Sequence, residues 1–228
     1  MRMRQLRKTV TLSLILLLAP HAAIAPHAQV AGTLRIYLAR HGETDWNVAH
    51  RLQGWTDRPL TDNGKRQAMD LAESLKGVRL DAIYSSTLSR SRDTAEVVAG
   101  GRMTVTSLPG LRERNYGKFQ TGSDTDPDYL KRLSAWDDDL DGGETLNQLL
   151  ARARESLATI RRDHPSGNVL IVGHRITNQT LLRALVDLTP EQAVKVDQGN
   201  DEVYLVEIDP GAAPRLWKLV RARNLGDL

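Results

Sequence analysis

Short, mainly apolar runs recur along the chain and predict the strands of a sheet. Two of them, residues 34–39 and 168–173, are each followed at once by polar, titratable residues. Residues 80–84 and 103–108 are shorter runs of the same character. Apolar runs without a regular polar alternation are typical of strands that are covered on both faces. The pattern therefore predicts a sheet in the interior of the domain.

Longer segments between these runs place apolar residues at helical spacing. Four of them predict helices: residues 61–76, 89–99, 145–164 and 177–186. Thr145 and Gln148 have the spacing of a capping box, in which each side chain bonds the other's backbone, and they mark the start of the third helix. Thr189, followed by proline, predicts one more short helix with that proline in its first turn.

The alternation of strands and helices predicts an α/β fold. Residues 203–208 and 216–220 add a closing antiparallel pair. Residues 115–143 are polar and irregular, with one short helix expected near residues 128–136, and an irregular stretch this long is usually functional. We therefore expect a three-layer domain, with a mostly parallel sheet and helices on both faces. Ligands bind such sheets beyond the carboxyl ends of the strands.

The first 32 residues differ from the rest of the chain. Four basic residues precede an apolar run at residues 10–20, and a stretch rich in Ala, His and Pro follows. This order is typical of a secretory signal peptide. The alternative is an uncleaved membrane anchor, although a spanning helix needs about 20 apolar residues. We expect residues 1–32 to be a leader, residues 33–228 to be the folded domain, and the protein to be periplasmic or secreted, with membrane contact only through an uncleaved leader.

Charge and composition narrow the partners. The chain has 31 basic and 28 acidic residues, a formal net charge of +3, but four of the basic residues lie in the leader. Residues 33–228 therefore hold 27 basic and 28 acidic residues and carry a net charge of −1. That balance gives no reason to expect nucleic acid as a partner. The chain has no cysteine, and the spacing of His and carboxylate residues predicts neither a metal site nor another cofactor.

Two histidines stand where a ligand would bind. His41 and His174 directly follow two of the predicted strands, so both are expected at the carboxyl edge of the sheet. Either alone could be a capping or surface ring, but Arg40 precedes the first, and Arg90 follows the strand at residues 80–84. An arginine can hold two phosphate oxygens, and a neutral imidazole can attack phosphorus. A solvent-facing salt-bridge residue is the alternative for Arg90.

Several sequence blocks resemble a known family. Residues 38–47 (LARHGETDWN) and 51–64 (RLQGWTDRPLTDNG) resemble the opening of the histidine phosphatase superfamily, in its phosphoglycerate mutase-like branch. Later blocks of the family match, in order, residues 84–95, 111–117, 142–145 and 172–174. The resemblance extends from about residue 35 to residue 206, and it identifies residues 33–228 as a histidine phosphatase domain with a phosphoglycerate mutase-like fold.

The resemblance implies a role for each matching residue. His41 would be the nucleophile that becomes a phosphohistidine, and Glu113 would protonate the leaving oxygen. Without the resemblance, Glu113 is as well explained as a surface residue. The phosphoryl group would lie in a pocket formed by Arg40, Arg90 and His174, with Asn47 assisting. Three more residues match positions that contact the substrate: Gln53, Gly54 and Tyr116.

Two departures from the family bear on the substrate. The family usually has glycine after the second histidine, where this chain has Arg175, whose extra positive charge would face a carboxylate or phosphate of the substrate. Mutases of the family carry basic residues after the proton donor. Here residues 122–143 are strongly acidic, and Lys131 and Arg132 are the only basic pair. The acidic stretch and the expected export disfavour a glycolytic mutase.

We therefore expect a phosphomonoesterase that hydrolyses a small phosphorylated substrate through a phosphohistidine on His41. A phosphoglycerate mutase or related phosphotransferase is the first alternative, and a requirement for a bisphosphate primer would favour it. A non-catalytic phosphate-binding module is the second alternative, and phosphate binding without turnover would favour it. The sequence leaves the identity of the substrate and the oligomeric state open.

Overall fold

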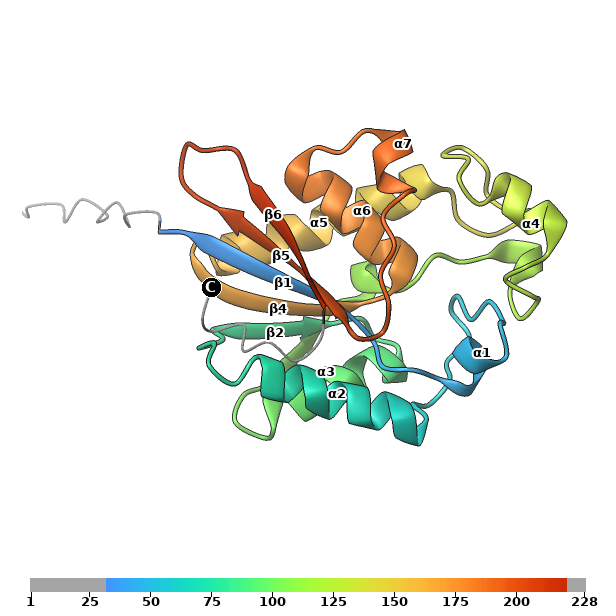
Figure 1. Ribbon diagram of the computed structural model, residues 1–228. Coiled ribbons are helices and arrows are strands. Elements are labelled where there is room, and N and C mark those ends of the chain that lie inside the picture. Colours follow the sequence, from blue (N-terminus) through green and yellow to red (C-terminus); the bar gives the residue numbers. More distant parts are fainter. Residues whose placement is uncertain (1–31, 221–228) are drawn as a thin grey trace, which may run out of the picture. The chain divides into compact units, whose positions relative to one another are not determined.

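The protein is described here by a computed structural model of residues 32–220, so the predicted signal peptide lies almost entirely outside the described residues. Within these residues the centre of the fold is a six-stranded sheet (Figure 1). The strands are β1 (Leu34–Arg40), β2 (Ala82–Ser85), β3 (Val105–Ser107), β4 (Gly167–Gly173), β5 (Glu202–Ile208) and β6 (Arg215–Val220). Their order across the sheet is β3-β2-β4-β1-β5-β6.

The sheet is mostly parallel. β2 pairs in parallel with β3 and with β4, and β4 pairs in parallel with β1. β5 is antiparallel to β1, and β6 is antiparallel to β5. The parallel core and the closing antiparallel pair predicted from the sequence are therefore confirmed.

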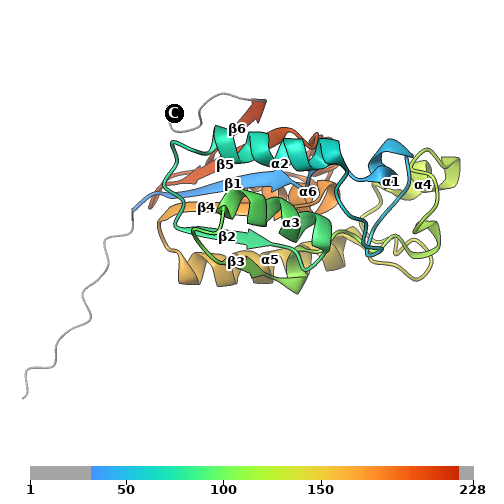
Figure 2. The ribbon, with the colours of Figure 1, turned by 90° about the horizontal axis from the view of Figure 1, so that it is seen from below.

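Helices cover both faces of the sheet (Figures 1 and 2). α2 (Asp62–Ser74) and α3 (Ser89–Ala99) lie on one face, and α5 (Leu146–Asp163) and α6 (Arg175–Val186) lie on the other. The connections hold α1 (Asp45–Val48), α4 (Pro127–Arg132), α7 (Pro190–Ala193) and the 3-10 turns η1 (Pro109–Leu111) and η2 (Gly117–Phe119). The three-layer α/β architecture is confirmed.

The side chains of β1 explain why the sheet needs helices on both faces. Leu34, Ile36 and Leu38 pack with residues of α5 and α6, whereas Tyr37 and Ala39 pack with residues of α2 and α3. Successive side chains of a strand point to opposite faces. Because β1 is apolar toward both faces, it is stable only when both are covered.

α6 begins earlier than the sequence predicts. It starts at Arg175 rather than two residues later, and His174 is its N-cap, with extended backbone angles. The capping box of Thr145 and Gln148 is present at the start of α5, as predicted. The chain thus passes from β4 into α6 through a single residue, and that residue is the second of the two candidate histidines.

The irregular stretch at residues 115–143, here called the cap, is held by buried contacts. The guanidinium group of Arg114 donates hydrogen bonds to the backbone oxygens of Leu133, Asp138 and Glu144. Apolar side chains of the cap and of neighbouring segments form their own cluster: Leu52, Tyr116, Phe119, Tyr129, Leu140, Leu146, Leu149 and Ile176. The short helix predicted near residues 128–136 is α4. The cap lies beyond the carboxyl ends of the parallel strands (Figure 1).

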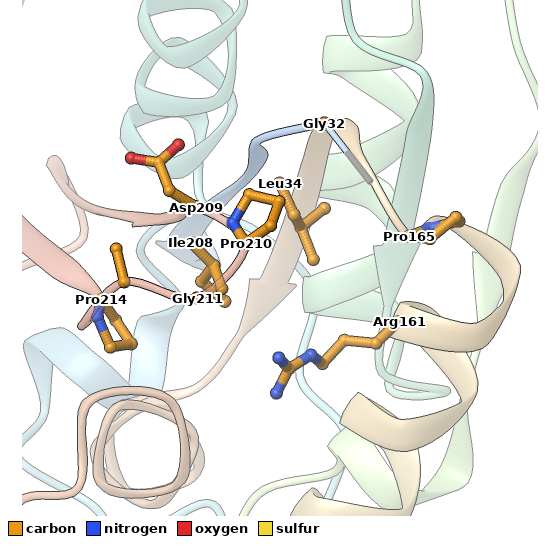
Figure 3. A pocket seen from close by; sticks show the side chains of 10 residues that line it. Gly32, Leu34, Arg161, Pro165, Ile208, Asp209, Pro210, Gly211 and Pro214 are labelled. Atoms are coloured by element: carbon orange, nitrogen blue, oxygen red, sulfur yellow. The ribbon is translucent and has the colours of Figure 1, made fainter. Parts of the chain in front are cut away.

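A pocket of about 530 Å³ lies at the opposite edge of the sheet (Figure 3). Leu34 at the start of β1 and Ile208 at the end of β5 line it, together with Arg161 and Pro165. β1 has seven residues. At the usual rise per residue, the pocket is therefore about 20 Å from the carboxyl end of β1. It contains none of the predicted site residues.

Candidate active site

The register of the sheet brings the two predicted histidines together. Arg40 at the end of β1 lies opposite Gly173 at the end of the parallel neighbour β4. The next residues are His41 and His174, whose ring centroids are 5.1 Å apart, with 58° between the ring planes. Both rings therefore stand at the carboxyl edge of the sheet, where ligands bind in α/β folds.

His41 is a buried ring with one unprotonated nitrogen. It is 3 % exposed, and its Nδ1 lies 2.7 Å from the carbonyl oxygen of Gly42. A carbonyl oxygen can only accept, so Nδ1 carries the proton and Nε2 keeps its lone pair. Burial, and then the charges of Arg90 and Arg40, lower the pKa of His41 well below its usual 6.5. The ring is therefore neutral at neutral pH.

Two guanidinium groups stand beside this ring. Arg90, in the first turn of α3, is 1 % exposed and donates to the carbonyl oxygens of Gly54 and Thr56 at 2.8 and 3.1 Å. Arg40 donates to the carbonyl oxygen of Gln198 at 3.0 Å. Burial lowers the pKa of both arginines. Arginine nevertheless stays protonated in proteins, so the site holds two desolvated positive charges that an anion would stabilise.

Three nitrogen atoms at this site share one property. Each is buried and has no hydrogen-bond partner within residues 32–220: Arg40 Nε, Arg90 Nε and His174 Nδ1. An unpaired buried donor costs about 1–3 kcal/mol, so such groups are rare and call for an explanation. After burial, the charges of Arg90 and Arg40 lower the pKa of His174, and the same two charges lower the pKa of His41, whose ring lies 5.1 Å from that of His174. Together they fit an oxyanion such as a phosphoryl group, whose oxygens accept several hydrogen bonds at once.

Glu113 lies between these guanidinium groups and the start of α6. Apart from burial, its charge is the leading influence on both guanidinium groups, and it raises the pKa of each. Its Oε1 accepts hydrogen bonds from the backbone N–H groups of Arg114 and Thr177 at 2.8 and 3.2 Å. The Thr177 hydroxyl also lies 3.2 Å from Oε1, but its nearer acceptor is the carbonyl oxygen of Arg112 at 2.8 Å. From residues 32–220, Oε2 accepts a single, longer bond, from the N–H of Ile176 at 3.3 Å. Oε2 is therefore the oxygen with room for a proton.

The three predicted substrate-contact residues are all near this site. Gln53 is buried, and its Oε1 has no partner in the described part of the chain. Gly54 has a φ of +49°, a backbone angle that favours glycine, and its carbonyl oxygen holds Arg90. Tyr116 is buried, and burial followed by the charge of Glu113 raises its pKa well above 10.0, which keeps its hydroxyl protonated.

Asn47 and Arg175 are placed less directly. The Oδ1 atom of Asn47 accepts bonds from the backbone and hydroxyl of Thr44 in a capping box at the start of α1, so only its amide hydrogens remain for a ligand. The side chain of Arg175 is 49 % exposed and lies 3.4 Å from Asp197. In addition to burial, its charge lowers the pKa of Arg40. Arg175 therefore acts on the same site, from its solvent side.

Three residues that were not predicted from the sequence hold the site in place. The amide of Asn200 donates to the carbonyl oxygen of His41 at 2.6 Å. The carbonyl of the buried Gln198 holds Arg40, as described above. Both precede β5 in a polar stretch, and that was the only signal in the sequence. The hydroxyl of Ser86 lies 2.7 Å from Nε2 of the second histidine; it is part of a matched block, but no role was assigned to it.

The arrangement supplies a nucleophile, a set of anion-binding donors and a carboxyl group within one site. Its positive charge comes from arginine side chains. The described residues contain no group of three or more His, Cys, Asp or Glu side chains that could hold a metal ion. Chemically, such a set can transfer a phosphoryl group, because that reaction needs mainly positioning and charge stabilisation.

The sequence of the chain matches a known protein family and is similar to individual proteins. The model of the histidine phosphatase superfamily, branch 1, matches residues 36–221. A metal-independent phosphoserine phosphatase of Arabidopsis thaliana is 37 % identical over 150 residues, which are 61 % of this chain and 63 % of that protein. The match therefore spans less than two thirds of the length of that relative.

Solved structures of similar fold include a phosphatase and a mutase. The mycobacterial glucosyl-3-phosphoglycerate phosphatase Rv2419c is 27 % identical, with a TM-score of 0.72, and the match covers 81 % of this chain and 97 % of that one. A phosphoglycerate mutase from Bacillus anthracis is 26 % identical, with a TM-score of 0.70 and coverage of 83 % and 93 %. Both activities therefore occur on this fold, so the choice between them depends on the site.

Proposed function

Because the chain belongs to branch 1 of the histidine phosphatase superfamily, we propose that it is a phosphomonoesterase that hydrolyses a small phosphate ester through a phosphohistidine on His41. One observation carries the proposal: Nε2 of the neutral, buried His41 is unprotonated, and its ring lies 5.1 Å from that of His174 and within the influence of the charges of Arg40 and Arg90. Each of these three neighbours has a buried nitrogen without a partner in the described residues. The ring supplies the nucleophile, and the nitrogens supply donors for the phosphoryl oxygens. Two similar proteins are a phosphoserine phosphatase and a glucosyl-3-phosphoglycerate phosphatase, which supports the same class of reaction for this chain.

In the first step, Nε2 of His41 attacks phosphorus, and the bond from phosphorus to the ester oxygen breaks. For this step Glu113 is in its protonated form rather than the charged form, and Oε2 gives that proton to the ester oxygen, so the product leaves as an alcohol. The phosphorylated ring becomes positively charged, and its Nδ1–H still donates to the carbonyl of Gly42. Arg40 and Arg90 stabilise the charge on the phosphoryl oxygens in a site where water is largely excluded.

In the second step, water attacks phosphorus from the side opposite His41. The carboxylate of Glu113 accepts a proton from that water, the bond between nitrogen and phosphorus breaks, and inorganic phosphate leaves. The ring returns to its neutral form, and Glu113 is again protonated. One carboxyl group serves as acid and then as base because the two steps are the reverse of each other in their proton transfers.

The cap favours a phosphatase over a mutase. Arg132 forms ion pairs with Asp138 and Asp141, and Lys118 forms ion pairs with Asp128 and Asp141. Lys118 and Arg132, two of the three basic side chains of the cap, are thus already paired with carboxylates, whereas a mutase uses free basic residues there to hold the acid end of its substrate. A binding module without turnover is disfavoured because Glu113 leaves one oxygen available for proton transfer.

The proposal extends to the location of the protein. Residues 1–32 would be a signal peptide, and residues 33–228 would be an enzyme exported to the periplasm or secreted, as the basic, apolar and small-residue order of the leader suggests. Among residues 32–220, no helix is both long enough and apolar enough to cross a membrane. N-terminal sequencing of the fractionated protein should find a start between residues 26 and 33. An intact N-terminus in the membrane fraction would contradict export by cleavage.

Release of inorganic phosphate from a panel of small phosphate esters tests the proposed function. The purified protein should release phosphate from at least one ester without a bisphosphate primer, and His41→Ala should release none. His164→Ala is the matched control, because that ring packs against Tyr84 and contacts none of the site residues; it should keep normal activity. Transfer that depends on a primer would identify a mutase, and phosphate binding without turnover would identify a binding module.

A further inference from the structure

Among the described residues, the side chain of His174 makes one hydrogen bond, and its partner is the hydroxyl of Ser86. Both His174 and Ser86 are fully buried. Nε2 of the ring lies 2.7 Å from the Ser86 hydroxyl oxygen. The other ring nitrogen, Nδ1, is buried and has no partner within residues 32–220. The two nitrogens therefore have separate roles: one contacts the serine, and the other is available to the phosphoryl group.

A count of hydrogens decides which nitrogen carries the proton. The Ser86 oxygen already accepts a bond from the backbone N–H of Leu88 at 3.2 Å. If Nε2 of His174 were protonated, the serine oxygen would accept a second bond, and its own hydroxyl hydrogen would have no acceptor in the described structure. If Nδ1 is protonated, the serine donates to Nε2, and the Nδ1 hydrogen is the only group of the pair left without a partner in residues 32–220, where a bound anion would accept it. Burial, and then the charge of Arg90, lower the pKa of His174 well below 6.5, so the ring has only one proton to place.

We propose that Ser86 is a positioning residue that fixes His174 as the tautomer with its proton on Nδ1, so that this nitrogen donates a hydrogen bond to the bound phosphoryl group. The identity of that group rests on the proposed function, but the tautomer is a property of the resting protein. With the opposite tautomer, Nδ1 would present a lone pair to phosphoryl oxygens and repel them. Ser86 therefore decides whether the second imidazole binds the anion or opposes it.

The sheet holds the serine in this position. Ser85, the last residue of β2, lies opposite Val172 in β4, so Ser86 and His174 leave neighbouring strands side by side. The backbone N–H of Ser86 donates to the hydroxyl of Ser91 at 3.0 Å, and that hydroxyl donates to the carbonyl of Val172 at 2.7 Å. In this series of hydrogen bonds, the Ser86 N–H and the Ser91 hydroxyl each have their own acceptor. The Ser86 hydroxyl is therefore available to donate to the His174 ring.

NMR of the full-length protein with ¹⁵N-labelled histidine, near neutral pH, tests the tautomer directly. The signals of His174 are assigned by their loss in His174→Gln. We expect Nδ1 to be protonated and Nε2 to show the shift of an unprotonated ring nitrogen. A protonated Nε2 in the wild-type protein would overturn the inference, and this measurement needs no variant of Ser86 that folds.

Activity provides the second test, with a matched control in the adjacent serine. Ser86→Ala should lower kcat/KM by roughly 10- to 100-fold, as for other partners that orient a functional histidine, and should weaken the binding of inorganic phosphate by a similar factor. Ser85→Ala removes an equally buried hydroxyl, which bonds Ser107 at 2.9 Å rather than the ring, and should change either value by less than about twofold. Ser86→Thr, which keeps the hydroxyl, should restore most of the loss.

The outcomes separate this inference from the proposed function. If Ser85→Ala and Ser86→Ala lose activity equally, with equal loss of thermal stability, Ser86 has only a structural role and the inference fails. If the wild-type protein releases no phosphate but the proton is on Nδ1 of His174, the proposed function fails and the tautomer stands. If the enzyme is active and the proton is on Nε2, only the role of Ser86 is lost.

Discussion

Glu113→Gln isolates proton transfer from the other contributions of the site. The substitution keeps the size of the side chain and removes its acidic proton. The backbone N–H groups of Arg114 and Thr177 donate to Oε1, and the N–H of Ile176 donates to Oε2. An amide with its oxygen at Oε1 keeps the first two bonds, but its NH₂ group then faces the N–H of Ile176, and two donors cannot bond each other. The variant should therefore be less stable by about 1–3 kcal/mol, and it should still fold.

The effect on the rate depends on the leaving group. An alkyl phosphate must otherwise release an alkoxide, and a positioned acid contributes about 100- to 10,000-fold to such a step. That range corresponds to about 2.7–5.4 kcal/mol of barrier. Nitrophenolate is a stable anion that needs little protonation. We expect Glu113→Gln to lose the full factor with the alkyl ester and less than about tenfold with nitrophenyl phosphate.

Steady-state phosphate release with both substrates measures the difference. Glu207→Gln is the control: Glu207 is another buried glutamate, and its oxygens pair with Arg35 at 2.7 Å and with Arg215, near the amino end of β1 and away from the site. It should affect both substrates alike through stability. If Glu113→Gln also slows both esters by the same factor, Glu113 is not the proton donor.

Two further predictions follow from the charges of the site. Arg175→Ala should raise KM about fivefold for a phosphate ester that carries a second anionic group, because a half-exposed ion pair contributes up to about 1 kcal/mol. It should leave KM unchanged for an alkyl phosphate without a second charged group. Equal changes of KM for the two esters would exclude that contact. His41 and His174 have folded-state pKa values depressed below 6.5, so the unfolded chain gains protons first as pH falls. The free energy of unfolding should be unaffected above pH 6.5 and fall below it by up to about 1.4 kcal/mol per pH unit for each ring. Denaturant titrations from pH 7 to pH 5 measure this slope. If the double variant His41→Gln, His174→Gln shows the same slope, the pH dependence does not come from these two rings.

The main elements of the fold could be predicted because the apolar side chains that form the pattern in the sequence are the ones that the sheet and its helices bury. β1 and β4 are largely buried on both faces, and their sequences are mainly apolar, which made both strands predictable. The start of α5 was predictable from the capping box of Thr145 and Gln148. The start of α6 was placed two residues late because a histidine as N-cap makes no side-chain cap bond and carries no signature in the sequence. The short helix α1 was missed because its four residues are too few to show a period.

The candidate site could be predicted only in part. His41 and His174 were found because each directly follows a buried strand, and the register of β1 with β4 brings them together. Asn200 could not be predicted, because it contacts the backbone of His41 across 159 positions of sequence, and no local pattern encodes such a contact. The pairing of the Ser86 hydroxyl with Nε2 of His174 likewise depends on two strand ends that meet only in the folded sheet.

Detection of phosphate on His41 during turnover tests the central claim most directly. The enzyme is mixed with a phosphate ester, quenched in alkali, in which phosphohistidine survives, digested and analysed by mass spectrometry. The account predicts one added phosphoryl group on the peptide that contains His41, lost on acid treatment and absent in His41→Ala. Turnover with no phosphate on that ring, or with phosphate on another residue, would contradict it.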